Sequence, residues 1–416
     1  MPMKKIAPSN IHGSLKIIPS KSVSHRALIC AALAKGDSVL KNMAFSEDIA
    51  ATANALRDMG LCEYELTGDV CTVHGGLRRE GKQEIDCGES GSTLRFLVPL
   101  ALDGKPRTFV GHGRLMKRPQ GAYGRIFIRN RVEVEKTENS ITICGTLDSG
   151  EYAMPGDISL QFVSGMLYAL PLLINDSGIH LTTKIESKPY IDLTRSVQKL
   201  FGIRSHWRGH IIDVSGRQGY RPHDMTIEGD YSHAAFFAVA AALSGEVLLQ
   251  GLEEDSDQGD REILGILQCM GADVEFREDG IFVRKNVLRP VEIDVSQIPD
   301  LVPVLAVLGC AVKGKMRIYN AGRLRYKESD RLHAMAHELE KLGADITEYE
   351  DSLVINGTGA LDGGEADSHF DHRIAMALAV ASCIAREPVV IRDPMVVRKS
   401  APNFYEEFAS LGGIVE

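Results

Sequence analysis

Apolar residues along the chain gather into helix-length runs that recur about every 70 residues. Each run follows small or polar residues and leads through Gly or a turn into a strand. The runs AAFFAVAAALSG, from Ala234, and LVPVLAVLGCAV, from Leu301, are apolar on nearly every side. The helices that they predict should therefore be buried all round. The six copies of the pattern begin at Ser20, Ser90, Gly156, Gly229, Ile298 and Phe370.

Between the copies lies a second, amphipathic helix, followed by Gly and a hairpin. In HAMAHELEKLGADITEYEDSLVING, Gly343 is typical of the left-handed residue past a helix end, and Glu350-Asp351 predicts a tight turn between two strands. The same theme recurs from Gly60, Gly202 and Gly271, with a weaker copy over 131–144.

The sixth repeat ends too early to form its own hairpin, because only Ile414–Glu416 follow its last helix. We expect Gly13–Ser20 to supply the missing strand, so that the termini pair and the first residues belong with the last repeats. Six βαβαββ repeats predict an α/β protein of two three-repeat domains, residues 20–226 and residues 1–19 plus 227–416. An inside-out arrangement, with buried helices and outer sheets, and a layered α/β core fit this pattern equally well.

Composition narrows the class of protein. The chain has 416 residues, of which 44% are hydrophobic and 25% charged, as is typical of globular proteins. Its apolar stretches reach roughly a dozen residues, fewer than the ~18 that span a bilayer, and because no apolar run follows the first two lysines we expect no signal segment. Eight scattered cysteines without a C-x-x-C pair indicate reduced thiols, so we expect a cytoplasmic protein that binds no membrane. A net charge of −9 argues against a nucleic-acid partner but leaves room for a local basic pocket.

Basic residues crowd the predicted helix starts, where the helix dipole and unpaired N–H groups already carry positive charge. An anion resolves the conflict, because helix N–H groups, hydroxyls, Lys and Arg together bind phosphate or carboxylate. Lys327 and Arg331, four apart, are expected on one helical face, and Pro402 suits the first turn of a helix. The basic residues at helix starts are Lys21, Arg26, Arg95, Lys327, Arg331, Arg373 and Lys399.

Each of these residues alone reads as an ordinary cap or a surface residue, but five clusters in register through a repeat favour anion binding. His369 and His372 stand three apart without a third ligand, so no metal site is expected. The chain has no phosphate-binding G-x-x-x-x-G-K-[ST] motif and no G-x-G-x-x-G after a strand. We therefore expect neither a nucleotide nor any other cofactor.

An ordered set of motifs resembles the 5-enolpyruvylshikimate-3-phosphate synthase family of enolpyruvyl transferases. The resemblance spans essentially the whole chain and implies two inside-out α/β domains of three repeats, joined by two crossovers, with the active site in the cleft between them. The motifs are P-S-K-S-V-S-H-R-A at 19–27, G-E-S-G-S-T-L-R at 88–95, K-R-P at 117–119, S-L-Q-F at 159–162, S-K-P-Y-I-D at 187–192, E-G-D at 228–230, I-P-D at 298–300, K-E-S-D-R at 327–331, D-H-R at 371–373 and R-K-S-A-P at 398–402.

The resemblance also implies two small-molecule substrates and the residues that bind them. Shikimate 3-phosphate is expected at Lys21, Ser22, Arg26, Ser159, Gln161, Ser187, Tyr190, Asp300 and Lys327. Phosphoenolpyruvate is expected at Lys21, Gly91, Arg95, Arg118, Gln161, Arg331, Arg373 and Lys399.

The implied chemistry is addition followed by elimination, through a tetrahedral intermediate in the shikimate pathway to aromatic amino acids. By resemblance Asp300 handles the proton of the 5-hydroxyl, Glu328 the proton of C3, and Lys21 assists at the bridging or leaving oxygen. Proton traffic of this kind suits carboxylates placed beside a lysine.

Four positions affect which residue roles and properties the resemblance implies. Glu89, Leu160 and Arg323 depart from the commonest family pattern, so no ligand role is given to their side chains. Gly91 occupies the place where, in the family, alanine accompanies tolerance of the inhibitor glyphosate. We therefore expect sensitivity to glyphosate.

Two other functions are alternatives to enolpyruvyl transfer to shikimate 3-phosphate. An enolpyruvyl transferase acting on UDP-N-acetylglucosamine would resemble a Cys-bearing loop, but GHGRLMKRPQ, from Gly111, has no cysteine. A non-enzymatic ring clamp would spread its basic residues along a continuous surface to meet a phosphate backbone. Here they cluster at helix starts, and we expect an enzyme that acts as a monomer.

Overall fold

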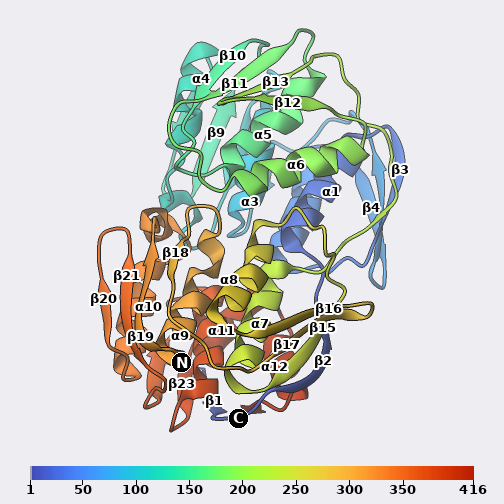
Figure 1. The fold of residues 1–416 in the computed structure, drawn as a ribbon. Coiled ribbons are helices and arrows are strands. Elements are labelled where there is room, and N and C mark those ends of the chain that lie inside the picture. The colour runs from blue at the N-terminus through green and yellow to red at the C-terminus, as the bar shows by residue number, and fades with distance from the viewer. Residues whose placement is uncertain (1) are drawn as a thin grey trace. The chain divides into compact units, whose positions relative to one another are not determined.

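The computed structural model describes residues 2–416 and divides into two compact units. The central unit comprises Pro19–Ile227, and the terminal unit comprises the residues up to Ile18 together with Glu228–Glu416. Each unit has its own hydrophobic core. Figure 1 shows that both ends of the chain belong to the terminal unit.

Helices form the interior of each unit. The helices of the central unit are α1 (Lys21–Leu33), α2 (Glu47–Asp58), α3 (Gly91–Leu97), α4 (Gly124–Arg129), α5 (Gln161–Ala169) and α6 (Lys188–Leu200). Those of the terminal unit are α7 (Tyr231–Ser244), α8 (Glu262–Met270), α9 (Val302–Ala311), α10 (Arg331–Lys341), α11 (His372–Ala381) and α12 (Phe404–Ser410).

Six four-stranded sheets surround these helices, three in each unit. In order across each sheet, the strands of the central unit are β14 (Met225–Thr226), β3 (Gly36–Lys41), β5 (Val70–Gly75) and β4 (Glu63–Thr67); β6 (Glu84–Asp86), β7 (Arg107–Val110), β9 (Ser140–Cys144) and β8 (Glu133–Lys136); and β10 (Glu151–Met154), β11 (Ser177–Leu181), β13 (Ile211–Val214) and β12 (Ser205–Arg208). Those of the terminal unit are β2 (His12–Lys16), β15 (Glu246–Gln250), β17 (Gly280–Arg284) and β16 (Asp273–Arg277); β18 (Glu292–Asp294), β19 (Lys313–Tyr319), β21 (Leu353–Thr358) and β20 (Ile346–Glu348); and β22 (Gly364–Asp367), β23 (Val389–Arg392), β1 (Met3–Ala7) and β24 (Ile414–Val415).

The inside-out arrangement is confirmed, and the layered alternative is wrong. Every residue of α7 except Ser232 is buried, and α7, α9 and α11 pack against one another in the interior of the terminal unit. The strands alternate instead: β5 and β9 bury every second residue toward the helices and leave the residues between them partly exposed. Helices that are apolar all round can be accommodated only where other elements surround them.

The strand that precedes α1 and the strand that precedes α7 each belong to a different unit from the helix that follows. Strand β2, which leads into α1, pairs in parallel with β15 in the terminal unit. Strand β14, which leads into α7, pairs in parallel with β3 in the central unit. The chain therefore crosses twice between the units, and each crossing completes a sheet of the unit that it leaves.

The expected pairing of the termini is confirmed, but the strand that serves it is not the expected one. Met3–Ala7 pairs antiparallel with Val389–Arg392 and with Ile414–Val415, and so fills the gap in the sixth sheet. The segment 13–20 was predicted for this place; its strand lies instead in the fourth sheet. The turn residues follow the prediction: Gly343 and Gly271 have φ of 93° and 104° past the ends of α10 and α8.

Two properties bear on the class of protein. Within residues 2–416, no helix is long and apolar enough to cross a membrane. All eight cysteines are free thiols, and five of them are buried, as the scattered spacing predicts.

Close approach of strands to the buried helices makes some glycines irreplaceable. A Cβ on Gly357, in β21, would lie 2.1 Å from the carbonyl oxygen of Val312 and 2.2 Å from that of Gly309. Gly75, at the end of β5, meets the carbonyl of Ala31 in α1 at 2.0 Å in the same way. The repeat thus uses glycine where the hairpin crosses the end of its first helix.

We expect Gly357→Ala to lower the free energy of unfolding by about 2–3 kcal/mol, because backbone atoms must move to admit the methyl group. Urea unfolding followed by circular dichroism measures the change. The matched control is Gly265→Ala in α8, where a Cβ would have a side-chain oxygen at 3.5 Å as its nearest neighbour. This control should gain up to ~1 kcal/mol from helix propensity. Equal effects of the two substitutions would contradict the steric argument.

Candidate active site

Lys21 begins α1, the first helix of the central unit. The side chain of Ser20 caps this helix by accepting from the backbone N–H of Val23 at 3.4 Å. The Lys21 ammonium lies 2.9 Å from the Asp48 carboxylate, which comes from the first turn of α2. A helix start that repels a cation is thus offset by a carboxylate from a neighbouring helix start.

Arg26 lies one turn further along α1 and is 1% exposed. Its Nε donates to the Thr194 hydroxyl at 2.9 Å, and its terminal nitrogens donate to the carbonyls of Ser22 and Tyr190 at 2.7 and 3.0 Å. In the described part of the central unit, no ion pair between Arg26 and a carboxylate is found. A buried guanidinium held by neutral groups is a strong attractor for an anion.

Arg95 and Gln161 connect α3 with α5. The Arg95 guanidinium donates to Gln161 Oε1 at 2.8 Å, and the Gln161 amide donates to the Ser92 hydroxyl at 2.9 Å. Beside them, Gly91 lies directly under Arg118, so that a Cβ on Gly91 would be 2.9 Å from Arg118 Nη1. Two guanidinium groups therefore lie at α3: that of Arg95 in its last turn, rather than at its start as predicted, and that of Arg118 against Gly91, which has no side chain.

The remaining predicted residues of the central unit lie at the starts of α5 and α6. Ser159 lies two residues before Gln161, the first residue of α5, and Ser187 is the buried N-cap residue of α6, with a left-handed φ of 59°. Tyr190 lies in the first turn of α6, where its carbonyl meets Arg26. A non-glycine residue held at positive φ is uncommon and points to a functional constraint.

In the terminal unit, three cations surround the Asp300 carboxylate. Asp300 lies in the 3₁₀ turn Pro299–Leu301, which leads into α9. Its carboxylate is 2.8 Å from Arg331 Nη1 and 3.3 Å from both Lys327 Nζ and Arg373 Nη2. Asp300 and Arg331 come from the fifth repeat and Arg373 from the sixth, so neighbouring repeats bring predicted residues together at one point.

Arg331 is the most enclosed of these cations. It begins α10, is 1% exposed, and also contacts Glu328 Oε2 at 2.8 Å and Asp371 Oδ2 at 2.8 Å. Asp371 is fully buried; it caps α11 by accepting from the N–H of Arg373 and also accepts from the Ser329 hydroxyl. Buried charges are tolerable only when they are paired and hydrogen-bonded in this way.

These contacts shift the ionisation of the site. Burial alone raises the pKa of Asp300, but the nearby Arg373, Lys327 and Arg331 outweigh it and hold that pKa well below its usual value. Burial lowers the pKa of Lys327 to about 8, although Asp300 acts in the opposite direction. At neutral pH the cluster therefore contains an ionised Asp300 and a lysine close to its titration point.

Two local expectations are wrong. Lys327 and Arg331 do not share a helical face, because Asp330 caps α10 and Lys327 ends the preceding 3₁₀ segment Gly322–Tyr326. The two meet nevertheless, since the turn between them brings both to Asp300. Pro402 does not lie in the first turn of a helix, because α12 begins at Phe404. Lys399 is buried at the end of the 3₁₀ segment Pro394–Lys399, which packs against α11.

Sequence reasoning missed three carboxylates of the site. Asp48 and Asp371 occupy helix starts, where an acid reads as an ordinary dipole or capping residue, so their ion pairs gave no signal of their own. Asp260, in the turn Gly259–Arg261, is buried and its Oδ2 accepts a hydrogen bond from the Ser232 hydroxyl. Burial and the nearby Asp300 raise the pKa of Asp260 to about 6. In a chain rich in acidic residues, only the fold separates such groups from the surface.

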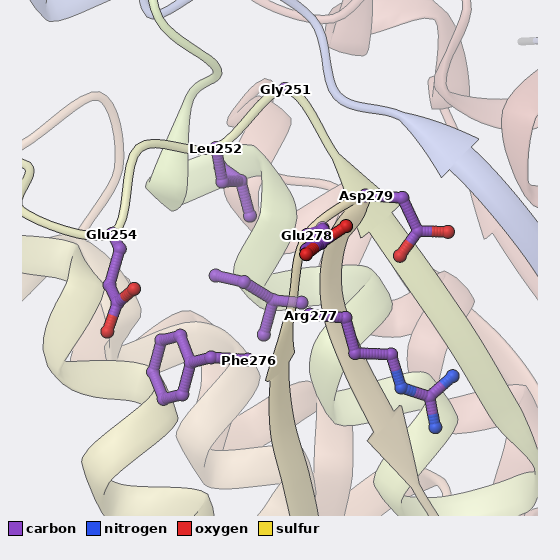
Figure 2. Close-up of a pocket in the computed structure, with 9 residues that line it drawn as sticks. Gly251, Leu252, Glu254, Phe276, Arg277, Glu278 and Asp279 are labelled. Carbon is purple, nitrogen blue, oxygen red and sulfur yellow. The ribbon is translucent and has the colours of Figure 1, made fainter.

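The described residues hold no cluster of metal ligands at this point, and a surface groove of the terminal unit is lined by other residues. Among residues 2–416, no group of three or more His, Cys, Asp or Glu is placed to hold a metal ion. A groove of about 150 Å³ lies beside the β16–β17 turn of the terminal unit and is lined by Leu252, Phe276 and charged residues of the turn. Figure 2 shows these side chains. None of the residues predicted for substrate binding lines this groove.

Comparisons with known proteins agree with the motifs. The family model EPSP synthase (3-phosphoshikimate 1-carboxyvinyltransferase) matches residues 6–408. The chain is 47% identical to the 3-phosphoshikimate 1-carboxyvinyltransferase of Clostridium perfringens, with 100% of both chains covered. It is 45% identical to the enzyme of the same name from Clostridioides difficile, with 99% of this chain and 98% of the relative covered.

Solved structures show the same architecture. An EPSP synthase from Acinetobacter baumannii superposes with a TM-score of 0.84 and 28% identity, over 100% of this chain and 99% of that one. An enolpyruvyl transferase from Streptomyces tendae, 17% identical, has a TM-score of 0.80 over 100% of this chain and 98% of its own, which shows the shared fold. Both the family model and the full-length relatives establish that the chain belongs to the EPSP synthase family.

Proposed function

We propose that the chain transfers the enolpyruvyl group of phosphoenolpyruvate to the 5-hydroxyl of shikimate 3-phosphate and releases phosphate. The observation that carries this proposal is the Asp300 carboxylate held by Lys327, Arg331 and Arg373. A general base surrounded by cations fits a reaction in which a hydroxyl must lose a proton between two polyanions. The family membership supports the same reaction.

The substrate contacts are proposed residue by residue. Shikimate 3-phosphate contacts Lys21, Ser22, Arg26, Ser159, Gln161, Ser187, Tyr190, Asp300 and Lys327. Phosphoenolpyruvate contacts Lys21, Gly91, Arg95, Arg118, Gln161, Arg331, Arg373 and Lys399. Both sets draw on the central and the terminal unit, so we propose that the two units act on the same pair of substrates.

The first step is an addition. The oxygen of the 5-hydroxyl forms a bond to C2 of phosphoenolpyruvate and gives its proton to Asp300. The π electron pair between C2 and C3 takes a proton at C3 from Glu328. Glu328 reaches the cluster through its contact with Arg331 Nη2, at 2.8 Å, while Asp300 contacts Nη1 of the same guanidinium.

The second step is an elimination from the tetrahedral intermediate. C3 returns a proton to Glu328, the C2–C3 double bond re-forms, and the bond between C2 and the phosphate oxygen breaks. Lys21 stabilises negative charge on the leaving oxygen. Holding both substrates in place removes most of the entropic cost of the first step, and the fixed cations stabilise the charge that develops.

Binding of the substrates changes the strength of Asp300 as a base. Without them, Lys327, Arg331 and Arg373 hold the pKa of the Asp300 carboxyl well below its usual value, although burial raises it, and this makes Asp300 a weak base. Anionic groups that bind these same cations compete with Asp300 for their charge. The pKa of Asp300 then rises toward the working pH, so the base gains strength only when the site is filled.

We further propose that the enzyme is a cytoplasmic monomer that needs no cofactor or metal. Support comes from the free cysteines and from the presence of both residue sets in one chain. Transfer to UDP-N-acetylglucosamine is the alternative reaction, and a test with both acceptors separates the two.

The proposal is tested by phosphate release from purified enzyme with both substrates and with each omitted in turn. Release should require both substrates. Lys21→Ala should reduce turnover by about 10²–10⁴-fold, because it removes the charge at the leaving oxygen. Lys136→Ala, an exposed lysine on β8, is the matched control and should keep full activity. Release with UDP-N-acetylglucosamine but not with shikimate 3-phosphate would move the chain to the alternative reaction.

The lowered pKa of Lys327 predicts that activity falls on the alkaline side of the pH profile. Burial lowers the pKa of this lysine to about 8, so the free enzyme loses the cation as pH rises through that value. We expect kcat/KM for shikimate 3-phosphate to fall above about pH 8. In Lys327→Arg the limb should move upward, because guanidinium stays protonated throughout this range. An unchanged limb in that variant would assign the titration to another group.

Gly91→Ala should weaken the binding of phosphoenolpyruvate and leave that of shikimate 3-phosphate nearly unchanged. The added methyl group would sit 2.9 Å from Arg118 Nη1 and 3.2 Å from Arg118 Cζ, which forces that guanidinium to move. We expect KM for phosphoenolpyruvate to rise roughly tenfold, with KM for shikimate 3-phosphate nearly constant. Gly121→Ala is the control, because a Cβ there meets nothing within 4 Å. A parallel rise in both constants would argue against a local effect on Arg118.

A further inference from the structure

The segment that leads into α11 has an unusual backbone. His369 and Phe370, consecutive non-glycine residues, have left-handed φ values of 51° and 54°. The Phe370 side chain is 68% exposed, so packing of its ring does not hold this conformation in place. Such a conformation persists only where other contacts determine it, and it is commonest at ligand sites. The next residue is Asp371, the buried partner of Arg331.

Glu338, on α10, binds this segment through hydrogen bonds to His369 and Asp367. Its side chain is fully buried; Oε1 is 2.8 Å from His369 Nε2, and Oε2 accepts from the backbone N–H of Asp367 at 2.9 Å. Lys341 lies 2.9 Å from both carboxylate oxygens. A carboxylate with this many donors is a fixed point in the structure, because each donor restricts its position.

From this point the contacts lead back to the proposed phosphoenolpyruvate site. The Asp371 N–H donates to the Ser368 carbonyl at 2.9 Å, which turns the chain into α11. Asp371 then accepts from Arg331 Nε at 2.8 Å and from Nη2 at 3.2 Å. Arg331 and Glu338 lie two turns apart on the same face of α10. One helix therefore contacts both ends of the segment that carries Asp371.

We propose that Glu338 and His369 are positioning residues for phosphoenolpyruvate: their hydrogen bond fixes the left-handed backbone at 369–370 and thereby sets Asp371 against Arg331. This inference rests on the proposed function, in which Arg331 contacts phosphoenolpyruvate. Neither Glu338 nor His369 touches the substrate. They act through the orientation of one guanidinium group.

The same pair makes the positioning sensitive to pH. The charged groups that face His369 are Glu338 and Lys341 from α10 and Asp367 from β22. The hydrogen bond to Glu338 raises the pKa of His369 above its ordinary value, whereas that of Glu338 is lowered to about 2 despite burial. Glu338 therefore stays ionised and His369 titrates. The ionic pair is complete at low pH and is lost as pH rises through the raised pKa of His369.

Two substitutions of His369 separate its hydrogen bond from its backbone. Asn tolerates the left-handed conformation but is too short to reach Glu338, whereas Gln keeps an N–H donor and does not titrate. We expect His369→Asn to raise KM for phosphoenolpyruvate roughly tenfold, with kcat and KM for shikimate 3-phosphate within about twofold. His369→Gln should restore KM to within about threefold of the wild type and flatten its dependence on pH.

Hydrogen exchange tests the positioning without activity. The amides of Asp371 and Arg373 donate to the Ser368 carbonyl and to Asp371 Oδ1, and they should exchange about tenfold faster in His369→Asn. His74→Asn is the matched control: this histidine bonds Asp37 at 2.8 Å and also has a raised pKa, but it lies in the central unit on β5. It should change neither KM nor this exchange.

The outcomes separate this inference from the proposed function. If His369→Asn leaves KM and exchange unchanged while the wild type turns over both substrates, the positioning role is wrong and the proposed function stands. If Gln is as impaired as Asn, the hydrogen bond is not the cause, and the inference also fails. If the wild type shows no turnover but exchange still rises in His369→Asn, the network is real and the proposed function is wrong.

Discussion

Positive charge held at the buried starts of helices is the constraint on which the rest of this structure depends. Helix dipoles and desolvation both oppose it, so each cation needs a compensating group. Lys21 uses a carboxylate from a neighbouring helix start, and Arg331 uses three carboxylates. Arg26 uses a hydroxyl and two carbonyls. The fold supplies these groups because equivalent helix starts recur in every repeat.

The repeat also explains why the site can be rigid. Helices that are apolar all round, such as α7, place few polar groups in the interior of the terminal unit. The buried Arg331 finds its partners at helix starts, whereas the buried Glu338 lies within α10 and pairs with His369 and Lys341. The exchanged strands β2 and β14 add a second constraint, because each crossing is anchored in a sheet of the unit that it leaves.

Much of the fold and many site residues could be predicted, because a repeat shows the same pattern six times. The buried helices, the left-handed Gly271 and Gly343, and the paired termini all follow from it. The resemblance implied two crossovers, but the sheet that β2 joins was mispredicted, because two sheets of the terminal unit each lack a strand that the first residues can supply. The turn before Arg331 was misjudged because Asp330 reads as an interior residue until its capping bond is seen. Asp48, Asp260 and Asp371 carry no sequence signal that distinguishes an ion-pair partner from a cap.

We interpret the ion pairs of the terminal unit as a preparation for anion binding rather than as a source of stability. Buried pairs of this kind contribute little net stability, because desolvation offsets most of their attraction. Their value lies in keeping Arg331 and Arg373 desolvated and oriented before any anion arrives, so that substrate binding replaces one set of negative charges by another. In the proposed mechanism, the Asp300 carboxylate then loses part of its cationic surroundings at the moment when a base is needed. Preorganised charge and a base that strengthens on binding are thus two consequences of one cluster.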